Sequence, residues 1–274
     1  GGGVQGDEPD MIRKMRIGQL QGAAMTAVGI GRIHRPVLSV GFPLLVRTDE
    51  EIDLLLERMS PDFDRGIEAS GYKLVAWSTS GWVYYYARRP VSRPDDLKAI
   101  KLWLWEGADP DELAAWISLG FQVVPLKATD VLMALQSGMI DAACVSPIVA
   151  AAYQWFALVP NMMDLKWSPL YGGLVLTGSA WQQIPADLRP ALLKAAREIG
   201  RDMNAANRDN ERQAIEVMKS HGLKITHPAP QDVALWEQVV GQAASRIVGR
   251  TIDRSSYEKA AAELRTIRAE GAKP

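Results

Sequence analysis

The sequence contains a single cysteine, Cys144, among its 274 residues, so no disulfide within the chain can hold the fold together. Positive and negative side chains nearly balance, with 31 Lys and Arg against 32 Asp and Glu. Without a basic run, this composition argues against nucleic acid or an anionic membrane surface as a partner. The most apolar stretch, residues 142–153, is interrupted by Ser146 and Pro147 and is too short to cross a bilayer. We therefore expect a globular chain that does not span a membrane.

Motifs of common enzyme classes are missing as well. The sequence has no P-loop, no G-x-S-x-G and no H-E-x-x-H, and none of its three histidines supports Cys144 as a nucleophile. His221 and His227 are six residues apart across an expected helix end and strand, which is a weak pattern for a metal site. The sequence therefore predicts no catalytic residue, no metal ligand and no cofactor. An enzyme on an α/β scaffold stays as the rival class and would need a nucleophile and base brought together by the fold.

What the sequence does contain is a regular alternation of expected strands and helices, which predicts an α/β fold. The length suits two lobes or one large α/β domain. Short apolar or β-rich runs predict strands at residues 22–26, 73–78, 82–88, 102–105, 122–126 and 140–145. Helical patterns predict separate helices at residues 50–59 and 62–70, and a long charged helix within residues 185–221.

One internal similarity supports two related lobes. Residues 16–25 can be laid over residues 136–145, because each stretch reads as a helix end, a glycine (Gly18 or Gly138) and a strand of small residues. In open α/β sheets, ligands meet the carboxyl ends of the strands. The repeat therefore predicts that a ligand contacts both lobes at the ends of these two strands.

The stretch Lys101-Leu-Trp-Leu-Trp-Glu-Gly107 places two tryptophans on one side of a short strand. Alternation directs Leu102 and Leu104 to one face and Trp103 and Trp105 to the other. The leucines are expected in the core. The tryptophans face a second layer of core, a partner or a pocket, and the stretch by itself leaves these three alternatives open.

Five further stretches carry a resemblance to a known family. They are Gly6-Asp7-Glu8, the loop Gly41-Phe42-Pro43-Leu44-Leu45, the segment Pro94-Asp95-Asp96-Leu97-Lys98-Ala99-Ile100-Lys101, the segment Ala134-Leu135-Gln136-Ser137-Gly138-Met139-Ile140-Asp141, and Trp181 followed by Ile184-Pro185. In this order the chain resembles the periplasmic solute-binding proteins of TRAP transporters, of the DctP type.

The resemblance implies a two-lobed periplasmic-binding-protein (Venus flytrap) architecture that closes on a small molecule and delivers it to TRAP membrane permease subunits. It implies a periplasmic location with the signal peptide removed, and no chemistry on the ligand. By the same resemblance, residues 1–88 form mainly lobe 1, residues 89–178 mainly lobe 2 with the chain crossing between the lobes near both ends of this segment, and residues 179–274 C-terminal helices that brace both lobes. Some members use the long helix to form a homodimer. The family's first strand and helix precede the Gly-Asp-Glu element, so we expect this chain to be truncated at its amino end.

The chain departs from the family where most members clamp a ligand carboxylate. Laid on this sequence, the arginine of that clamp falls at Trp103, and the preceding strand offers no arginine before Arg88. An indole presents a wide apolar surface with one N–H donor, which predicts a largely hydrophobic or aromatic ligand. The candidate ligand-binding residues are Trp103, Trp105, Trp82, Tyr84, Phe42, Cys144, Ser146, Trp155, Trp167 and Tyr171.

Three alternatives stay open at this point. In the first, the tryptophans only pack between layers, and Cys144 is only a small buried residue. In the second, the ligand is an organic acid held by Arg47, Arg88 or Lys101, or by backbone N–H groups. In the third, the chain is a ligand-sensing domain attached to a signalling module, and it would bind its ligand in the same way as a transport protein.

Overall fold

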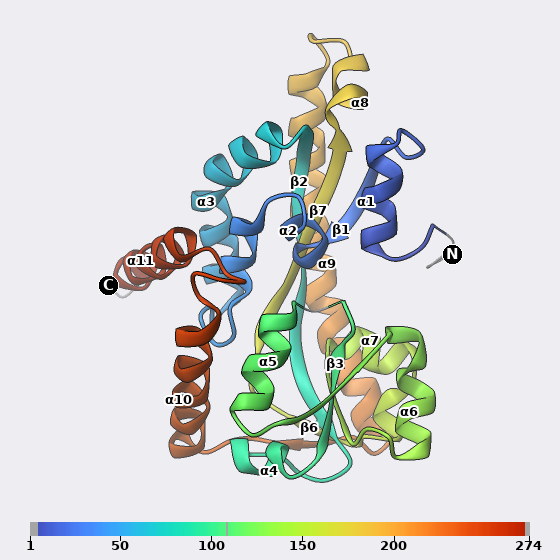
Figure 1. Ribbon diagram of the computed structural model, residues 1–274, viewed down its shortest axis with the longest axis vertical. Coiled ribbons are helices and arrows are strands. Elements are labelled where there is room, and N and C mark those ends of the chain that lie inside the picture. Colours follow the sequence, from blue (N-terminus) through green and yellow to red (C-terminus); the bar gives the residue numbers. More distant parts are fainter. Residues whose placement is uncertain (1–4, 108, 272–274) are drawn as a thin grey trace. The chain divides into compact units, whose positions relative to one another are not determined.

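The structure, a computed structural model, describes residues 5–107 and 109–271. The chain forms two compact units. Unit 1 consists of residues 1–81, 170–207 and 252–274, and unit 2 of residues 82–169 and 208–251. The predicted α/β fold with two lobes is confirmed. The units do not follow sequence order, because the chain passes from one to the other within strands and within a long helix. Figure 1 labels the helices and strands on the ribbon.

The elements of unit 1 are α1 (Glu8–Arg16), β1 (Gly22–Thr26), α2 (Ala27–Gly31), η1 (Arg35–Gly41), α3 (Asp49–Ala69), the first part of β2 (Tyr72–Ala87), most of β7 (Ser168–Thr177), α8 (Gly178–Gln183), the first part of α9 (Arg189–Ser220) and α11 (Arg254–Gly271). In its sheet, β7 lies between β1 and β2. At Gly172 a Cβ atom would lie 2.2 Å from the carbonyl oxygen of Met25, so this antiparallel pairing of β7 with β1 requires glycine.

Unit 2 contains the second part of β2, α4 (Pro94–Lys98), β3 (Lys101–Trp105), α5 (Pro110–Ser118), β4 (Gln122–Leu126), η2 (Ala128–Asp130), α6 (Val131–Ser137), β5 (Ala142–Val145), α7 (Pro147–Ala152), η3 (Trp155–Ala157), β6 (Asn161–Met163), the end of α9, β8 (Lys224–Thr226) and α10 (Pro230–Ile247). The strand order is β2-β5-β3-β4, with β6 pairing β2 and β8. β3 runs parallel to β4 and β5, and β2 runs antiparallel to β5.

The internal repeat predicted from the sequence is confirmed in its local structure. Gly18 follows α1 with φ of +76°, and Gly138 follows α6 with φ of +73°. This left-handed conformation is the usual way for glycine to end a helix. Each glycine is followed by a short strand and then a short helix, β1 and α2 in unit 1 and β5 and α7 in unit 2.

The prediction of separate strands at residues 73–78 and 82–88 is wrong, because residues 72–87 form one strand, β2, which continues through the turn-like residues Thr79-Ser80-Gly81. Side chains of α9 form hydrogen bonds with backbone groups that a turn would otherwise have paired. The amide of Asn207 donates to the carbonyl of Thr79 at 2.8 Å, and the Thr79 N–H donates to Asn204 Oδ1 at 2.8 Å. The strand therefore continues through a sequence with turn propensity.

The prediction of two helices at residues 50–59 and 62–70 is also wrong, because α3 is a single helix with Pro61 inside it. Proline removes one helical hydrogen bond and clashes with the preceding turn. Here both halves bury apolar side chains, Leu55 and Met59 before the proline and Phe63 and Ile67 after it. Packing on both sides keeps the helix continuous despite the local cost.

Candidate ligand-binding site

The sheet of unit 2 has two faces whose residues follow from the strand register. Leu102 pairs with Ala142, and Tyr85 pairs with Cys144. Paired residues point to the same side of a sheet, and neighbours in a strand point to opposite sides. One side, called the Tyr85 face, therefore carries Tyr85, Leu102, Ala142 and Cys144. The opposite side, called the Trp103 face, carries Trp82, Tyr84, Tyr86, Trp103, Trp105 and Val145.

Trp103 lies half-buried on the Trp103 face. Its indole Nε1 donates to the carbonyl oxygen of Leu126 in the neighbouring strand at 3.0 Å. Its ring meets the ring of Trp155 edge-on, with centroids 5.7 Å apart. The single N–H donor of Trp103 is therefore already used, and the side chain offers an apolar surface.

Two further rings extend this surface along the segment after α7. Trp155 is 3% exposed, and Tyr153 stacks on it with centroids 5.6 Å apart while remaining 63% exposed. Trp103, Trp155 and Tyr153 thus form a continuous row of aromatic rings, called the aromatic row below. Tyr153 was not predicted from the sequence, because one exposed tyrosine in an apolar helix end carries no periodic signal.

Trp82 and Tyr84 are buried on the Trp103 face, 1% and 5% exposed. The ammonium group of Lys166 lies over the ring of Trp82 at 4.7 Å from its centroid, a distance typical of a cation–π contact. Lys166 was also missed, since the sequence places it in a loop with no motif around it. It brings a positive charge to the same strand that carries these two rings.

Trp167 and Cys144, by contrast, belong to the Tyr85 face. Trp167 lies in a packed cluster of aromatic rings, 5.0 Å from Tyr85 and 5.6 Å from Trp236. Burial raises the pKa of the Cys144 thiol, and the nearby Glu112 carboxyl raises it further. The thiol is therefore protonated at neutral pH and is a poor nucleophile. The structure does not bring these two residues together with Trp103.

Ser146 and Trp105 mark the carboxyl ends of neighbouring strands. Ser146 is 4% exposed, and its hydroxyl accepts a hydrogen bond from Val149 N at 3.4 Å, so it caps α7. The half-buried ring of Trp105 lies against Gly107, where a Cβ atom would come within 2.6 Å of it. Both residues stand at the edge where open α/β sheets bind ligands.

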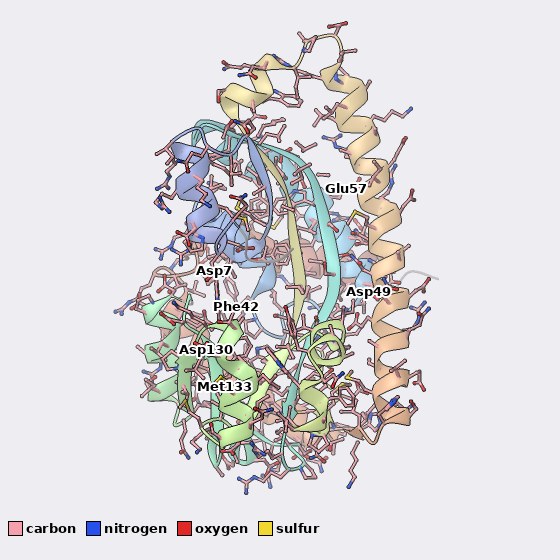
Figure 2. All side chains as sticks on the ribbon, turned by 90° about the vertical axis from the view of Figure 1, so that its right-hand side faces the viewer. Asp7, Phe42, Asp49, Glu57, Asp130 and Met133 are labelled. Carbon is pink, nitrogen blue, oxygen red and sulfur yellow. The ribbon has the colours of Figure 1, made fainter. Side chains whose placement is uncertain are left out.

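Phe42 and Tyr171 belong to unit 1. Phe42, labelled in Figure 2, is buried and meets Tyr257 of α11 edge-on at 5.0 Å. The hydroxyl of Tyr171 donates to the carbonyl of Val37 at 2.6 Å and accepts from Gly41 N at 3.0 Å. Burial raises the pKa of Tyr171, so this hydroxyl stays protonated and anchors the loop before Phe42.

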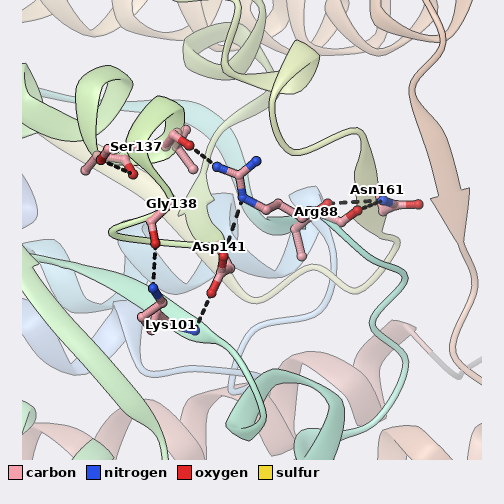
Figure 3. Close-up of polar contacts among 9 residues, drawn as sticks. Arg88, Lys101, Ser137, Gly138, Asp141 and Asn161 are labelled. Carbon is pink, nitrogen blue, oxygen red and sulfur yellow. Dashed lines mark hydrogen bonds and ion pairs between the residues drawn. The ribbon is translucent and has the colours of Figure 1, made fainter.

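Arg88 and Lys101, considered above as partners for a ligand carboxylate, lie after the end of β2 and at the start of β3, away from the carboxyl end of β3. Figure 3 shows their polar contacts. Nε of Arg88 pairs with Asp141 at 3.4 Å, and its Nη2 donates to the carbonyl of Leu135. Nζ of Lys101 donates to the carbonyl of Gly138. Both cations thus fasten the turn between α6 and β5, and neither reaches the carboxyl ends of the strands.

Asp141 ends the most specific of the family-like segments, and its role in the structure is to hold three strands together. Its carboxylate accepts from Lys101 N at 3.2 Å, and its own N–H donates to the Lys101 carbonyl at 2.7 Å. Its carbonyl accepts from Arg88 N at 3.0 Å. The end of this segment therefore stabilises the pairing of these strands.

Arg47, the third cation considered, lies in unit 1. Its backbone N–H donates to Glu51 Oε2 at 2.7 Å. Across residues 5–107 and 109–271, no group of three or more His, Cys, Asp and Glu side chains is arranged to hold a metal ion.

Sequence comparison with known proteins identifies the family of this chain. The profile of the bacterial extracellular solute-binding proteins, family 7 (DctP), matches residues 2–250. The C4-dicarboxylate-binding periplasmic protein DctP of Rhodobacter capsulatus is 24% identical over 191 residues, which is 68% of this chain and 57% of that protein. The sialic acid-binding periplasmic protein SiaP of Vibrio cholerae is 21% identical over 229 residues, 81% of this chain and 70% of that protein. The chain thus spans somewhat over half the length of the first relative.

Solved structures resemble the fold. A TRAP periplasmic solute-binding protein from Ralstonia eutropha, with bound (S)-2-acetolactate, gives a TM-score of 0.85 at 19% identity over 96% of this chain and 85% of that one. Another, from Ochrobactrum anthropi, gives a TM-score of 0.86 at 19% identity over 98% and 84%. None of the helices in the described residues combines the length and apolar character needed to cross a membrane.

Proposed function

The chain belongs to the bacterial extracellular solute-binding proteins of family 7, and we propose that it carries a largely hydrophobic or aromatic, lipid-like small molecule to the permease of a TRAP-type transporter. The named relatives are periplasmic proteins, so the predicted periplasmic location agrees with the family. The proposal concerns the cargo and its delivery, and it assigns no chemical reaction to the protein.

The observation that carries the proposal is the side chain at position 103. By the family resemblance, most members are expected to have a carboxylate-binding arginine at this position, and this chain has Trp103. The Trp103 N–H is bonded to Leu126, which leaves only ring surface to face a ligand. A ring of this kind stabilises an apolar ligand by about 25 cal/mol for each Å² removed from water.

A carboxylate bound at this position would be unfavourable in free energy. Desolvating an anion without a paired cation costs roughly several kcal/mol. Arg88 and Lys101, the two cations considered as replacements for the missing guanidinium, are held by backbone carbonyls at the other end of the strands. The surroundings of Trp103 therefore favour a neutral ligand.

The alternative cargo is an organic acid. The Ralstonia eutropha protein holds (S)-2-acetolactate, and a similar protein from Shewanella oneidensis holds succinate. Lys166, over the ring of Trp82, is the cation of unit 2 that favours this alternative. Because an ammonium group lacks the planar fork of arginine, it would bind a carboxylate as a point charge.

Mass spectrometry of an organic-solvent extract of the purified protein separates the two cargoes. A lipid, sterol or aromatic molecule recovered in near-stoichiometric amount would support the proposal. A small carboxylate recovered instead would contradict it and favour the organic-acid alternative, with Lys166→Ala as the next variant to test.

A further inference from the structure

The indole N–H of Trp155 is buried, and it has no hydrogen-bond partner within the described part of the chain. Trp155 belongs to the aromatic row, between Trp103 and Tyr153. Trp103, in the same row, does pair its N–H, with Leu126. A buried donor without a partner is unfavourable, and such a group in a folded protein calls for an explanation.

The residue before Trp155 is held in an unfavourable backbone conformation. Gln154 has φ of +55° and ψ of +26°, a left-handed geometry that residues with a Cβ atom rarely adopt. Strain of this kind gathers at ligand-binding and switching segments. It persists here between Tyr153 and Trp155, so the strained residue and the unpaired donor belong to one short segment.

We propose that the unpaired N–H of Trp155 is the group that recognises the cargo, and that the cargo carries a neutral hydrogen-bond acceptor such as a ketone, ester or ether oxygen beside its apolar body. This inference rests on the proposed apolar cargo and specifies its chemistry. The aromatic row supplies the surface for the apolar part, and Trp155 supplies the one directional contact.

Tyr153 covers one face of the Trp155 ring. Of the two rings that contact Trp155, Tyr153 is the more exposed. Displacing the Tyr153 ring would open that face of Trp155 to the apolar body of a ligand, while Trp103 stays fixed by its bond to Leu126. A neutral acceptor fits this donor, since an indole N–H cannot balance the charge of a desolvated carboxylate.

A matched pair of probes tests the donor directly. 2-Acetylnaphthalene and 2-ethylnaphthalene have nearly the same size, but only the first has a carbonyl oxygen. We expect calorimetric titration of the cargo-free protein to show roughly three- to tenfold tighter binding of the ketone, the usual range for one net hydrogen bond. In Trp155→Phe this preference should disappear, while the hydrocarbon still binds.

A second replacement preserves the shape of the ring. Benzothienylalanine at position 155 keeps the bicyclic ring and loses only the N–H, so it should remove the ketone preference without lowering the unfolding temperature of the ligand-free protein. The same replacement at position 103 breaks the bond to Leu126 and should lower that temperature. Gln154→Gly, which relieves the positive φ and leaves all three rings in place, should keep the ketone preference.

The outcomes separate this inference from the proposed function. Equal binding of both naphthalenes by the unaltered protein, or a ketone preference that survives at position 155 without the N–H, would overturn the role of Trp155 and leave an apolar cargo standing. Failure of both probes together with binding of succinate would overturn both proposals.

Discussion

The exchange of a guanidinium for an indole at position 103 makes this one side chain the sharpest test of the cargo. We expect Trp103→Ala to weaken binding of the extracted apolar cargo by about 1–3 kcal/mol, the cost typical of removing a central aromatic contact. Calorimetric titration of both proteins with that cargo measures the loss. Circular dichroism checks that the fold is retained.

Trp181→Ala is the matched control, because Trp181 belongs to α8 of unit 1, where its ring contacts Lys73 and Arg189. This variant removes a ring of the same size and should leave cargo affinity unchanged. An unchanged affinity in Trp103→Ala would mean that Trp103 only packs against Trp155, and the argument for the site would fail.

Glu51 offers a test of stability that depends on pH. Burial by itself would raise its pKa, but hydrogen bonds and charge from Arg268 and Arg47 lower it overall. The carboxylate accepts from Arg268 Nε at 2.8 Å and from Arg268 Nη2 at 3.0 Å. A lowered pKa in the folded state means that the group stabilises the fold above its ordinary pKa, and that this stabilisation is lost as the pH falls through the folded value.

We therefore expect Glu51→Gln to lower the free energy of unfolding by roughly 1.5–3 kcal/mol at pH 7, the range for charge-assisted hydrogen bonds. The difference from the unaltered protein should be smaller at pH 3, because the stabilisation from a carboxyl group with a lowered pKa declines as the pH falls below the ordinary pKa of that group. Urea unfolding at the two pH values measures it. A difference of the same size at both values would show that charge on Glu51 is unimportant.

Local alternation predicted the faces of single residues within β3, and long-range pairing decided the rest. Leu102 is 2% exposed and Trp103 lies on the other face, as the period of two requires. Cys144 was grouped with Trp103 because it lies near the end of a repeated strand, and Trp167 because of the family resemblance. Whether they share a face depends on the register between β2, β3 and β5, which the sequence of one strand does not carry.

Among the helices and strands, the predictions failed where a distant element overrides local propensity. Thr79-Ser80-Gly81 favours a turn, but its backbone groups pair with Asn204 and Asn207 of α9. The sequence showed the turn residues correctly, and it could not show that side chains of a helix 125 residues later replace the turn's hydrogen bonds.

Asn204→Ala tests this account of β2. Its amide oxygen accepts from Thr79 N at 2.8 Å and contacts the hydroxyl of Ser78 at 3.2 Å. Removing it leaves a strand N–H without its partner, which should cost about 1–3 kcal/mol. We expect faster hydrogen exchange at Thr79 and a matching loss in urea unfolding. Asn210→Ala, farther along the same helix, is the control; an effect of equal size there would point to α9 as a whole.

For the whole molecule, the sequence predicted two lobes and approximate residue ranges for them, but it does not carry the residues at which the chain passes from one unit to the other. Unit 1 takes three separate segments and unit 2 takes two. The repeat around Gly18 and Gly138 is local and was visible in the sequence. The assignment of α11 to unit 1 rests on contacts between residues about 200 positions apart, such as Arg58 with Glu263 at 3.3 Å.

α11 packs against the rest of unit 1 through ion pairs, hydrogen bonds and apolar contacts. Arg268 binds Glu51 and also donates from Nη2 to the carbonyl of Leu45 at 2.8 Å. Leu264 is fully buried and Ile267 is 6% exposed. Deleting residues 252–274 would therefore expose the apolar face of α3 and free the loop that carries Phe42.

We expect this deletion to destabilise unit 1 selectively, because cooperative units that lose buried contacts open locally before the whole protein unfolds. Hydrogen exchange followed by mass spectrometry should show lost protection in α3 and η1, while α5 and α10 of unit 2 keep theirs. The double variant Arg265→Ala and Arg254→Ala, which changes charges on α11 and keeps the helix, is the control. Equal loss of protection in both units would show that α11 stabilises the molecule as one cooperative whole, and the division into separately stable units would then be wrong.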